Sequence, residues 1–236
     1  MSATGVINLY KPRWISSARY VYRLRRLVGV RRVGHAGTLD PFADGVLLAC
    51  VGPATRLTER LMGLTKTYEV GLRLGVTNAS FDPEQPFESL PVASPPTEDA
   101  VRAALPDFIG TVMQSPPAFS AMKVGGSRGY DRARAGVTLE LPPRPVRIDR
   151  IELMSYEWPE VRLQVTCGRG TYIRALARDL GLRWRCGAVC VSLRRTRVGP
   201  FGIEDALDLG SADAALIRQA LRSIEEVEPL LQSPSS

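Results

Sequence analysis

Two stretches of strictly alternating residues constrain the fold of this chain more than any other feature. Residues 66–74 (KTYEVGLRL) and residues 161–167 (VRLQVTC) each carry an apolar side chain at every second position. Because successive side chains of a strand point to opposite faces, each stretch is expected to form a strand with one buried face. The chain must therefore build a sheet and cover at least one side of it.

The other segments mix strand-length apolar runs with helical periodicity. Further strands are expected at residues 5–10, 45–51, 108–113, 146–156 and 186–194. Helices are expected after a cap at Ser16 or Ser17, and at residues 54–62, 97–105, 172–182 and 214–230. Since the two kinds of element follow no regular βα order, the sequence predicts an α+β fold with a mixed, largely antiparallel sheet flanked by helices. Residues 82–96 are dense in proline and are expected to form an exposed loop.

The balance of charge favours a polyanionic partner. The chain has 31 Lys and Arg against 24 acidic residues, a formal charge of +7, and most of the cations are arginine, whose planar guanidinium suits phosphates and stacked bases. The N-terminal residues lack a basic stretch followed by an apolar run, and no run of about 18 apolar residues occurs. A cytoplasmic protein that does not contact the membrane is expected.

Metal and disulfide chemistry are not expected from this composition. The four cysteines form no C-x-x-C pair, the chain has a single histidine, and no G-x-x-x-x-G-K-[ST] phosphate loop is present. The cysteines are expected to be reduced and buried, and no metal or cofactor is expected.

Asp40 lies in the segment most indicative of chemistry, residues 34–45 (GHAGTLDPFADG). Three glycines and one proline in twelve residues predict a tight loop that allows a ligand to approach the backbone closely. Pro41 biases Asp40 toward an extended, accessible conformation, in which its carboxylate could serve as a nucleophile or a general base. Taken alone, an Asp-Pro pair more often opens an ordinary turn.

The wider pattern resembles TruB-family tRNA pseudouridine synthases. Residues 34–47 match the family signature G-H-x-G-T-L-D-P-x-A-x-G-v-L. Five further segments resemble family elements in the same order: residues 11–12 (K-P), 52–56 (G-x-A-T-[KR]), 66–69 (K-x-Y), 114–124 (Q-x-P-P-x-[YF]-S-A-x-K-x) and 169–174 (K-G-T-Y-I-R, here RGTYIR). The resemblance extends from about residue 5 to about residue 206.

The resemblance implies a pseudouridine synthase fold with an inserted basic loop, and a defined reaction. Uridine 55 in the T-loop of tRNA would be flipped out, its uracil detached from C1′ of the ribose, turned, and rejoined through C5. No cofactor or metal is implied, the partner is the T-stem-loop of tRNA, and a monomer is expected.

The resemblance also assigns catalytic roles to three residues. Asp40 would be the essential carboxylate, and whether it attacks the sugar or removes the 2′-proton stays open. Arg174 would keep Asp40 ionised and oriented. Tyr68 would place its ring against the uracil, although packing in its strand explains the same residue. The residues expected to bind substrate or RNA are His35, which would fill the vacated stack, with Tyr172, Lys11, Arg56, Lys123, Arg128, Arg132 and Leu193.

The chain departs from the family pattern at three places. Trp14 stands where a glycine is usual, and Asp44 stands where a threonine is usual and could raise the pKa of Asp40 unless a cation compensates. We expect a catalytic domain over residues 1–210 that includes an RNA-clamping insertion at 119–144. Residues 211–236 are expected to form a helix and a frayed tail in place of a complete C-terminal PUA domain.

Two other functions would use parts of the same sequence. A tRNA-binding module without catalysis would have no need of Asp40, Tyr68 and Arg174 together. An aspartate-nucleophile phosphatase would require a D-x-D-x-[TV] pattern, which this sequence lacks.

Overall fold

The computed structural model describes residues 3–117, 123–124, 127–128 and 142–231. The chain divides into two compact units, the first made of Met1–Tyr68 and Arg194–Ser236 and the second of Glu69–Leu193. The chain passes from one unit to the other within β4 (Lys66–Leu74) and again within β12 (Ala188–Val198). The second unit is thus inserted into the first, which is discontinuous in sequence. Among the described helices, none has both the length and the apolar character needed to cross a bilayer.

The sheet of the first unit is built around β3 (Asp44–Val51), which is buried at all eight positions. Strand β1 (Gly5–Lys11) and strand β2 (Val33–Ala36) both pair with it antiparallel. The end of β12 pairs with β3 in parallel, with Arg194 opposite Asp44, and β13 (Phe201–Gly202) pairs antiparallel with β12. One parallel pairing among antiparallel ones confirms the expectation of a mixed sheet.

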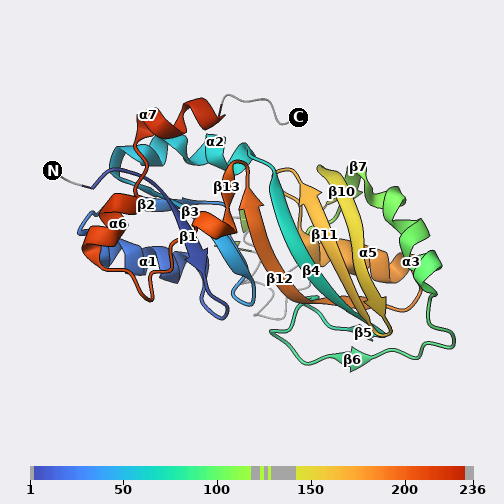
Figure 1. The fold of residues 1–236 in the computed structure, drawn as a ribbon. Helices are drawn as coiled ribbons and strands as arrows, with labels where there is room; N and C mark the ends of the chain where they lie inside the picture. The colour runs from blue at the N-terminus through green and yellow to red at the C-terminus, as the bar shows by residue number, and fades with distance from the viewer. Residues whose placement is uncertain (1–2, 118–122, 125–126, 129–141, 232–236) are drawn as a thin grey trace. The chain divides into compact units, whose positions relative to one another are not determined.

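Helices cover both faces of this sheet (Figure 1). Alternate residues of β1 and β3 contact two different clusters, since Ile7 packs with α1 (Ser17–Val28) and α6 (Ala214–Ala220) while Val6 packs with α2 (Thr58–Gly63) and α7 (Ile224–Val227). The 3-10 helices η1 (Gly52–Leu57), η3 (Ile203–Asp205) and η4 (Pro229–Leu231) complete the unit. Because successive side chains of β1 and β3 point to opposite faces of the sheet, this unit has one hydrophobic core on each face.

The prediction of one helix over residues 214–230 was wrong. The chain breaks between α6 and α7 because the backbone of Arg222 turns to pair with β1, exchanging hydrogen bonds with Val6 of 2.8 and 2.9 Å. Ser223 then restarts a helix, with its hydroxyl and the Glu226 carboxylate forming a capping box. A Cβ atom at Gly5 would lie 2.4 Å from the Arg222 carbonyl oxygen, so this contact requires glycine.

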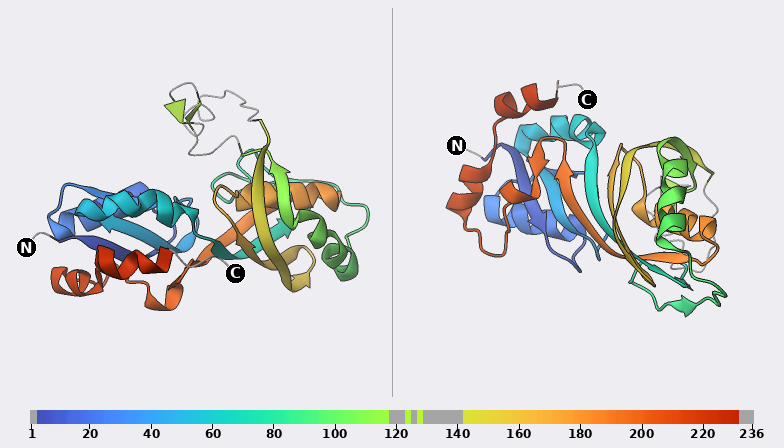
Figure 2. Two further views of the ribbon diagram at one scale, coloured as in Figure 1. Left: turned by 90° about the horizontal axis from the view of Figure 1, so that it is seen from above. Right: turned by 45° about the vertical axis from the view of Figure 1, so that its right-hand side comes forward.

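The second unit contains a sheet in which β12, β4, β11 (Glu160–Cys167), β10 (Arg144–Glu157) and β7 (Gly110–Gln114) are neighbours in that order. Two register shifts in the β10–β11 pairing accompany the long curved course of β10 in Figure 2. Helix α5 (Ile173–Arg183) lies across this sheet, and α3 (Glu98–Ala104) with η2 (Leu105–Phe108) precedes β7. The alternating apolar positions of β4 and β11 are buried, as the sequence predicts.

The proline-rich segment differs from its prediction at its start. Most residues between 86 and 96 are exposed, and the short strand β6 (Glu88–Ser89) pairs there with β5 (Val76–Thr77). Asp82, however, is only 3% exposed, because its carboxylate is held in a polar network. In the expected RNA-clamping insertion, β8 (Lys123–Val124) pairs with β9 (Ser127–Arg128), while Arg132 lies outside the described residues.

Candidate active site

Asp40 lies in the first unit, on the loop between β2 and β3. Its backbone carbonyl accepts a hydrogen bond of 3.1 Å from the amide of Ala43, so the Asp-Pro pair does open a tight turn. Leu39 and Phe42 on either side are buried, whereas Asp40 is partly exposed. The turn therefore presents one carboxylate from a loop that is anchored by its apolar neighbours.

Lys11 anchors the same loop from β1. The residue is fully buried, and its Nζ donates to the carbonyl oxygens of Ala43 at 2.7 Å, Ile15 at 2.8 Å and Pro41 at 3.4 Å. The charge of Lys11 thus holds the loop that carries Asp40. Its contact with substrate or RNA stays a prediction.

Ser17 supplies a second anchor. Its hydroxyl exchanges hydrogen bonds of 2.9 Å with both the carbonyl and the amide of Leu39, the residue before Asp40. Because Ser17 is the first residue of α1, the loop is fixed to this helix.

Arg195, which the motifs did not indicate, holds the two ends of the loop. It is 1% exposed and donates to the carbonyl of Val46 at 2.7 Å and to that of Gly37 at 3.1 Å. Gly45 has φ 106°, and a Cβ atom there would lie 2.2 Å from the Arg195 carbonyl oxygen. Only glycine permits this approach between β3 and β12.

Asp44, one of the departures from the family pattern, is neutralised by an arginine. Its two carboxylate oxygens accept hydrogen bonds of 3.1 and 3.0 Å from Arg194, and Tyr10 donates a third bond of 3.0 Å. Burial and the neighbouring Asp44 raise the pKa of Tyr10, so its hydroxyl stays protonated. The compensating cation that the sequence required therefore exists, and it is Arg194.

Trp14, the other departure from the family pattern in this region, has a backbone conformation that favours glycine. Its φ is 65°, in the left-handed region, and its amide donates a hydrogen bond of 2.6 Å to the carbonyl of Pro41. The indole is 64% exposed. The loop geometry is thus compatible with the substitution, at the cost of strain at Trp14.

His35 lies on β2, beside the Asp40 loop. Burial, and secondarily the charge of Arg195, lower the pKa of its imidazole, which is therefore neutral at pH 7. Within the described part of the chain, its buried Nδ1 has no hydrogen-bond partner. Its stacking role toward RNA stays a prediction.

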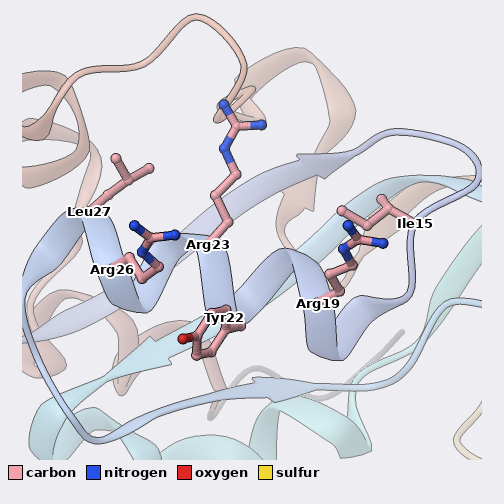
Figure 3. Close-up of a pocket in the computed structure, with 6 residues that line it drawn as sticks. All are labelled: Ile15, Arg19, Tyr22, Arg23, Arg26 and Leu27. Carbon is pink, nitrogen blue, oxygen red and sulfur yellow. The ribbon is translucent and has the colours of Figure 1, made fainter.

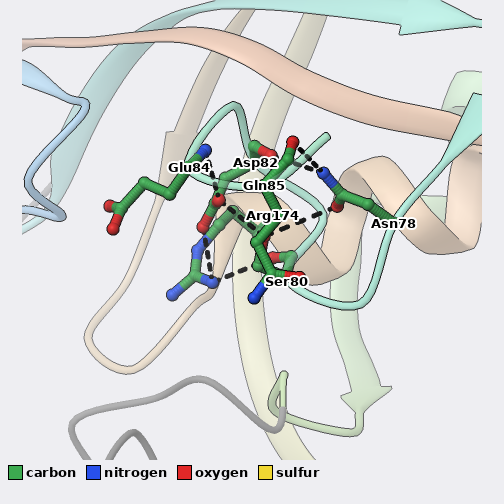
Figure 4. Close-up of polar contacts among 6 residues, drawn as sticks. All are labelled: Asn78, Ser80, Asp82, Glu84, Gln85 and Arg174. Atoms are coloured by element: carbon green, nitrogen blue, oxygen red, sulfur yellow. Dashed lines mark hydrogen bonds and ion pairs between the residues drawn. The ribbon is translucent and has the colours of Figure 1, made fainter. Parts of the chain in front are cut away.

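Arg174 lies in the second unit, in the first turn of α5, and belongs to a buried polar cluster (Figure 4). Its Nη1 donates to the Asp82 carboxylate at 3.0 Å and to the carbonyl of Ser80 at 2.9 Å, and the two charged side chains are 4% and 5% exposed. The sequence prediction paired Arg174 with Asp40 and overlooked Asp82. Asp40 and Arg174 belong to different units, and their pairing stays a prediction.

Asp82 is held in turn by its own loop. The Ser80 hydroxyl donates to its Oδ1 at 2.6 Å, and the amide of Glu84 donates to the same atom at 3.0 Å. Asn78 fixes the backbone by donating to the carbonyls of Asp82 and Gln85. A carboxylate held by this many donors gives the guanidinium of Arg174 a fixed orientation.

Tyr172 immediately precedes α5 and is bound at its backbone. The Gln114 side-chain amide donates to its carbonyl at 3.1 Å and accepts from its N–H at 2.8 Å. The guanidinium of Arg144 lies 5.2 Å from the centre of the Tyr172 ring. Gln114 and Arg144 thus fix a residue that the family pattern places at the substrate.

The other predicted residues have differing surroundings. Tyr68 and Leu193 are 8% and 5% exposed, so packing accounts for both and leaves their contact with substrate a prediction. Arg56 is exposed and lies 3.5 Å from Glu228 at the surface. Lys123 faces Arg128 in the backbone register of the β8–β9 hairpin.

Comparisons with known proteins agree on one family. The family model described as TruB family pseudouridylate synthase (N terminal domain) matches residues 25–173, and that of the tRNA pseudouridylate synthase B C-terminal domain matches residues 174–232. The chain is 45% identical over 206 residues to a tRNA pseudouridine synthase B of Syntrophobacter fumaroxidans, covering 87% of this chain and 67% of that protein. It is 42% identical over 230 residues to one of Burkholderia pseudomallei, covering 97% of this chain and 76% of that protein.

Solved structures show the same fold. The Cbf5 chain of a Cbf5-Nop10-Gar1 complex superposes with a TM-score of 0.70 at 27% identity, covering 95% of this chain. A structure of an H/ACA RNP bound to a substrate RNA containing 2′-deoxyuridine gives a TM-score of 0.69 at 26% identity. In both comparisons this chain spans 61% of the solved chain. The α+β architecture is that of a pseudouridine synthase, and the chain belongs to the TruB family of pseudouridylate synthases.

Proposed function

We propose that this protein converts uridine 55 in the T-loop of tRNA to pseudouridine, with Asp40 as the catalytic carboxylate. The observation that carries the proposal is the anchored loop of residues 37–43, which presents a single partly exposed Asp from a segment that matches the family signature. Lys11, Ser17 and Arg195 hold that loop through its backbone. A catalytic group must be held in this way to stay within reach of its target atom.

The reaction breaks the bond between C1′ and N1 and forms a bond between C1′ and C5 of the same uracil. C5 then gives up its proton, and N1 gains one, so the product is an isomer of the substrate. Asp40 acts at the ribose, either by adding to C1′ or by taking the 2′-proton. Both routes require an ionised carboxylate, which a guanidinium favours, and Arg174 is the residue assigned to that role.

The uridine must leave its stack before the sugar can be reached, at a cost of a few kcal/mol. His35, neutral at pH 7, offers a flat ring to occupy the vacated place, since an aromatic face stacks on any base. Tyr68 offers its ring to the detached uracil. We expect the protein to act as a monomer and without a metal or cofactor.

The test is to incubate the protein with an unmodified tRNA transcript in the presence of a metal chelator and to map pseudouridine in the product. Wild-type protein is expected to modify position 55, and Asp40→Asn to lower turnover by at least about 10⁴-fold, the scale seen when an essential catalytic group is removed. Asp107→Asn is the matched control, because Asp107 is an exposed carboxylate paired with Arg183 on the surface. Absence of pseudouridine with wild-type protein, or full activity of Asp40→Asn, would refute the proposal.

A further inference from the structure

Helix α1 has two faces of opposite character. Tyr20, Val21 and Leu24 are buried against the sheet, while the residues on the other side are exposed. Four of the exposed residues follow the i, i+3, i+4, i+7 spacing of one helical stripe. This stripe, which we call the arginine face, consists of Arg19, Tyr22, Arg23 and Arg26.

The arginine face borders an open hollow of about 670 Å³, which Ile15 and Leu27 complete at its two ends (Figure 3). Tyr22 is 58% exposed and stands between the cations along the helix. Tyr20, two residues earlier, is instead buried and uses its hydroxyl to bind Asp208 and the amide of Leu209. The packing of α1 therefore accounts for one tyrosine and not for the other.

The positive charge of the whole protein is concentrated in this part of the sequence. Residues 1–39 contain Lys11 and seven arginines and no acidic residue. Removing these 8 cations from the total of 31 leaves 23, one fewer than the 24 acidic residues of the chain. The formal charge of +7 thus comes entirely from the segment that contains α1.

The arginine face lacks the ion pairs that other exposed arginines make. In the described part of the chain, Arg19, Arg23 and Arg26 have no carboxylate within 4.0 Å, the limit for an ion pair. Three other arginines, each about half exposed or more, do pair with a glutamate: Arg102 with Glu98, Arg150 with Glu152, and Arg197 with Glu204.

Helix stability does not explain this arrangement. Arg19 lies in the first turn of α1, where a positive charge opposes the helix dipole, and that turn contains no acidic residue. Arg19 and Arg23, and Arg23 and Arg26, are like-charged neighbours at i,i+4 and i,i+3, a spacing that destabilises a helix. Only Arg26, in the last turn, is favourably placed. A polyanionic ligand would offset this repulsion.

The arginine face is rigidly linked to the catalytic loop within the same unit. Ser17, two residues before Arg19, exchanges hydrogen bonds with the backbone of Leu39, next to Asp40. A ligand bound to α1 is therefore held on the element that anchors Asp40.

We propose that the arginine face binds the phosphate backbone of a helical segment of the tRNA substrate, outside the active site. The proposal rests on the proposed function for its choice of RNA. Arginine guanidiniums bind phosphate oxygens in a bidentate manner, and the hydroxyl of an exposed tyrosine can donate to another. Such contacts position the RNA without reading its sequence.

The test compares two triple variants that remove the same charge. Arg19→Ala/Arg23→Ala/Arg26→Ala removes the arginine face, and Arg102→Ala/Arg150→Ala/Arg197→Ala removes three paired arginines. Binding of unmodified tRNA transcript is measured over a series of KCl concentrations. The first variant is expected to raise the Kd at least about tenfold and to reduce the slope of log Kd against log salt by about two to three, since each phosphate contact contributes nearly one.

Two further readouts separate binding from a structural role. The thermal midpoint of the first variant should equal or exceed that of the wild type, because repulsion is relieved. With saturating tRNA its kcat should be unchanged, while KM rises. A shared loss of affinity in both triple variants would overturn the proposal, because net charge would then explain it.

Unchanged tRNA affinity and salt slope in the first variant would also overturn it. Binding to vesicles of anionic lipid is measured in parallel, and a loss of vesicle binding without a loss of tRNA binding would assign the arginine face to a membrane surface. These results are distinct from failure of the proposed function, which appears as absence of pseudouridine in the wild type. The affinity and salt slope for tRNA are measured without turnover.

Discussion

The Asp40 loop and the Arg174 cluster hold their functional side chains by different means. Around Asp40, cations and a hydroxyl bind backbone groups of the loop, and the carboxylate stays partly exposed. Around Arg174, a buried carboxylate binds the guanidinium itself, and both charges are withdrawn from solvent. The first arrangement fixes the position of a side chain through the backbone that carries it, and the second fixes a charge through the side chain itself.

The largest effect is expected from breaking the Arg174 cluster. Asp82→Ala removes a buried carboxylate that accepts from the Arg174 guanidinium, so the free energy of unfolding should fall by about 3–5 kcal/mol and turnover should fall with it. Urea unfolding and single-turnover rates measure the two losses. Asp107→Ala, which breaks a pair that is 56% exposed at both ends, should cost less than about 1 kcal/mol. If both variants lost the same free energy of unfolding, the buried Arg174–Asp82 pair would be no more important for stability than the exposed Arg183–Asp107 pair.

The next effect is expected from releasing the Asp40 loop. Lys11→Met removes a charged donor from several carbonyl groups, of which that of Ala43 is buried, which should lower the free energy of unfolding by about 2–3 kcal/mol and loosen Asp40. Turnover should fall sharply at a temperature where the variant is fully folded. Val227→Ala, a core truncation on α7, serves as the control for lost stability alone. If both variants keep wild-type turnover, Lys11 does not position Asp40.

A smaller effect of opposite sign is expected at Trp14. Relief of its left-handed backbone in Trp14→Gly should raise the free energy of unfolding by about 1 kcal/mol, because the exposed indole contributes little packing. Trp14→Ala keeps the Cβ atom and should give no such gain. Denaturation of the three proteins under one condition compares them, and a loss of stability in Trp14→Gly would show that the indole packs on the loop.

The smallest effect concerns pH. The pKa of His35 lies below its usual value of 6.5 in the folded protein, chiefly because the residue is buried. Below about pH 6.5 the unfolded chain therefore binds a proton at His35 that the folded protein does not bind. Stability should therefore decrease as the pH falls through this window and should not change with this group above it. His35 is the only histidine, so His35→Gln should flatten the profile measured by thermal unfolding above the range of the carboxylates. An unchanged profile in the variant would remove His35 as its source.

Local patterns predicted the elements of the fold well. The alternation in β4 and β11 identified their buried faces. The start of α1 was expected after a cap at Ser16 or Ser17, and the structure shows that the cap is Ser16. The break between α6 and α7 was not predictable from periodicity, because it depends on the pairing of Arg222 with Val6, more than 200 positions away in the sequence.

The sequence predicted those residues of the candidate site that lie in family motifs, but not the contacts that hold them. The signature identified Asp40, but it gave no sign that Lys11 is buried beneath the loop or that Asp82, in a proline-rich stretch, binds Arg174. Arg194 illustrates the same limit. The sequence indicated that a cation could compensate for Asp44, but it did not indicate that Arg194, one of 31 basic residues, is the one that binds it.

The backbone pairing of Val6 with Arg222 bears on the order in which the protein forms during synthesis. Residues 69–193 are continuous and can fold as soon as they have left the ribosome, whereas β1 lacks this partner until Arg222 has emerged. At about 5–20 residues per second, the time between the synthesis of β1 and that of Arg222 is roughly 10–40 s. The inserted unit is therefore expected to mature first, and the unit that carries Asp40 is completed only after Arg222 has emerged.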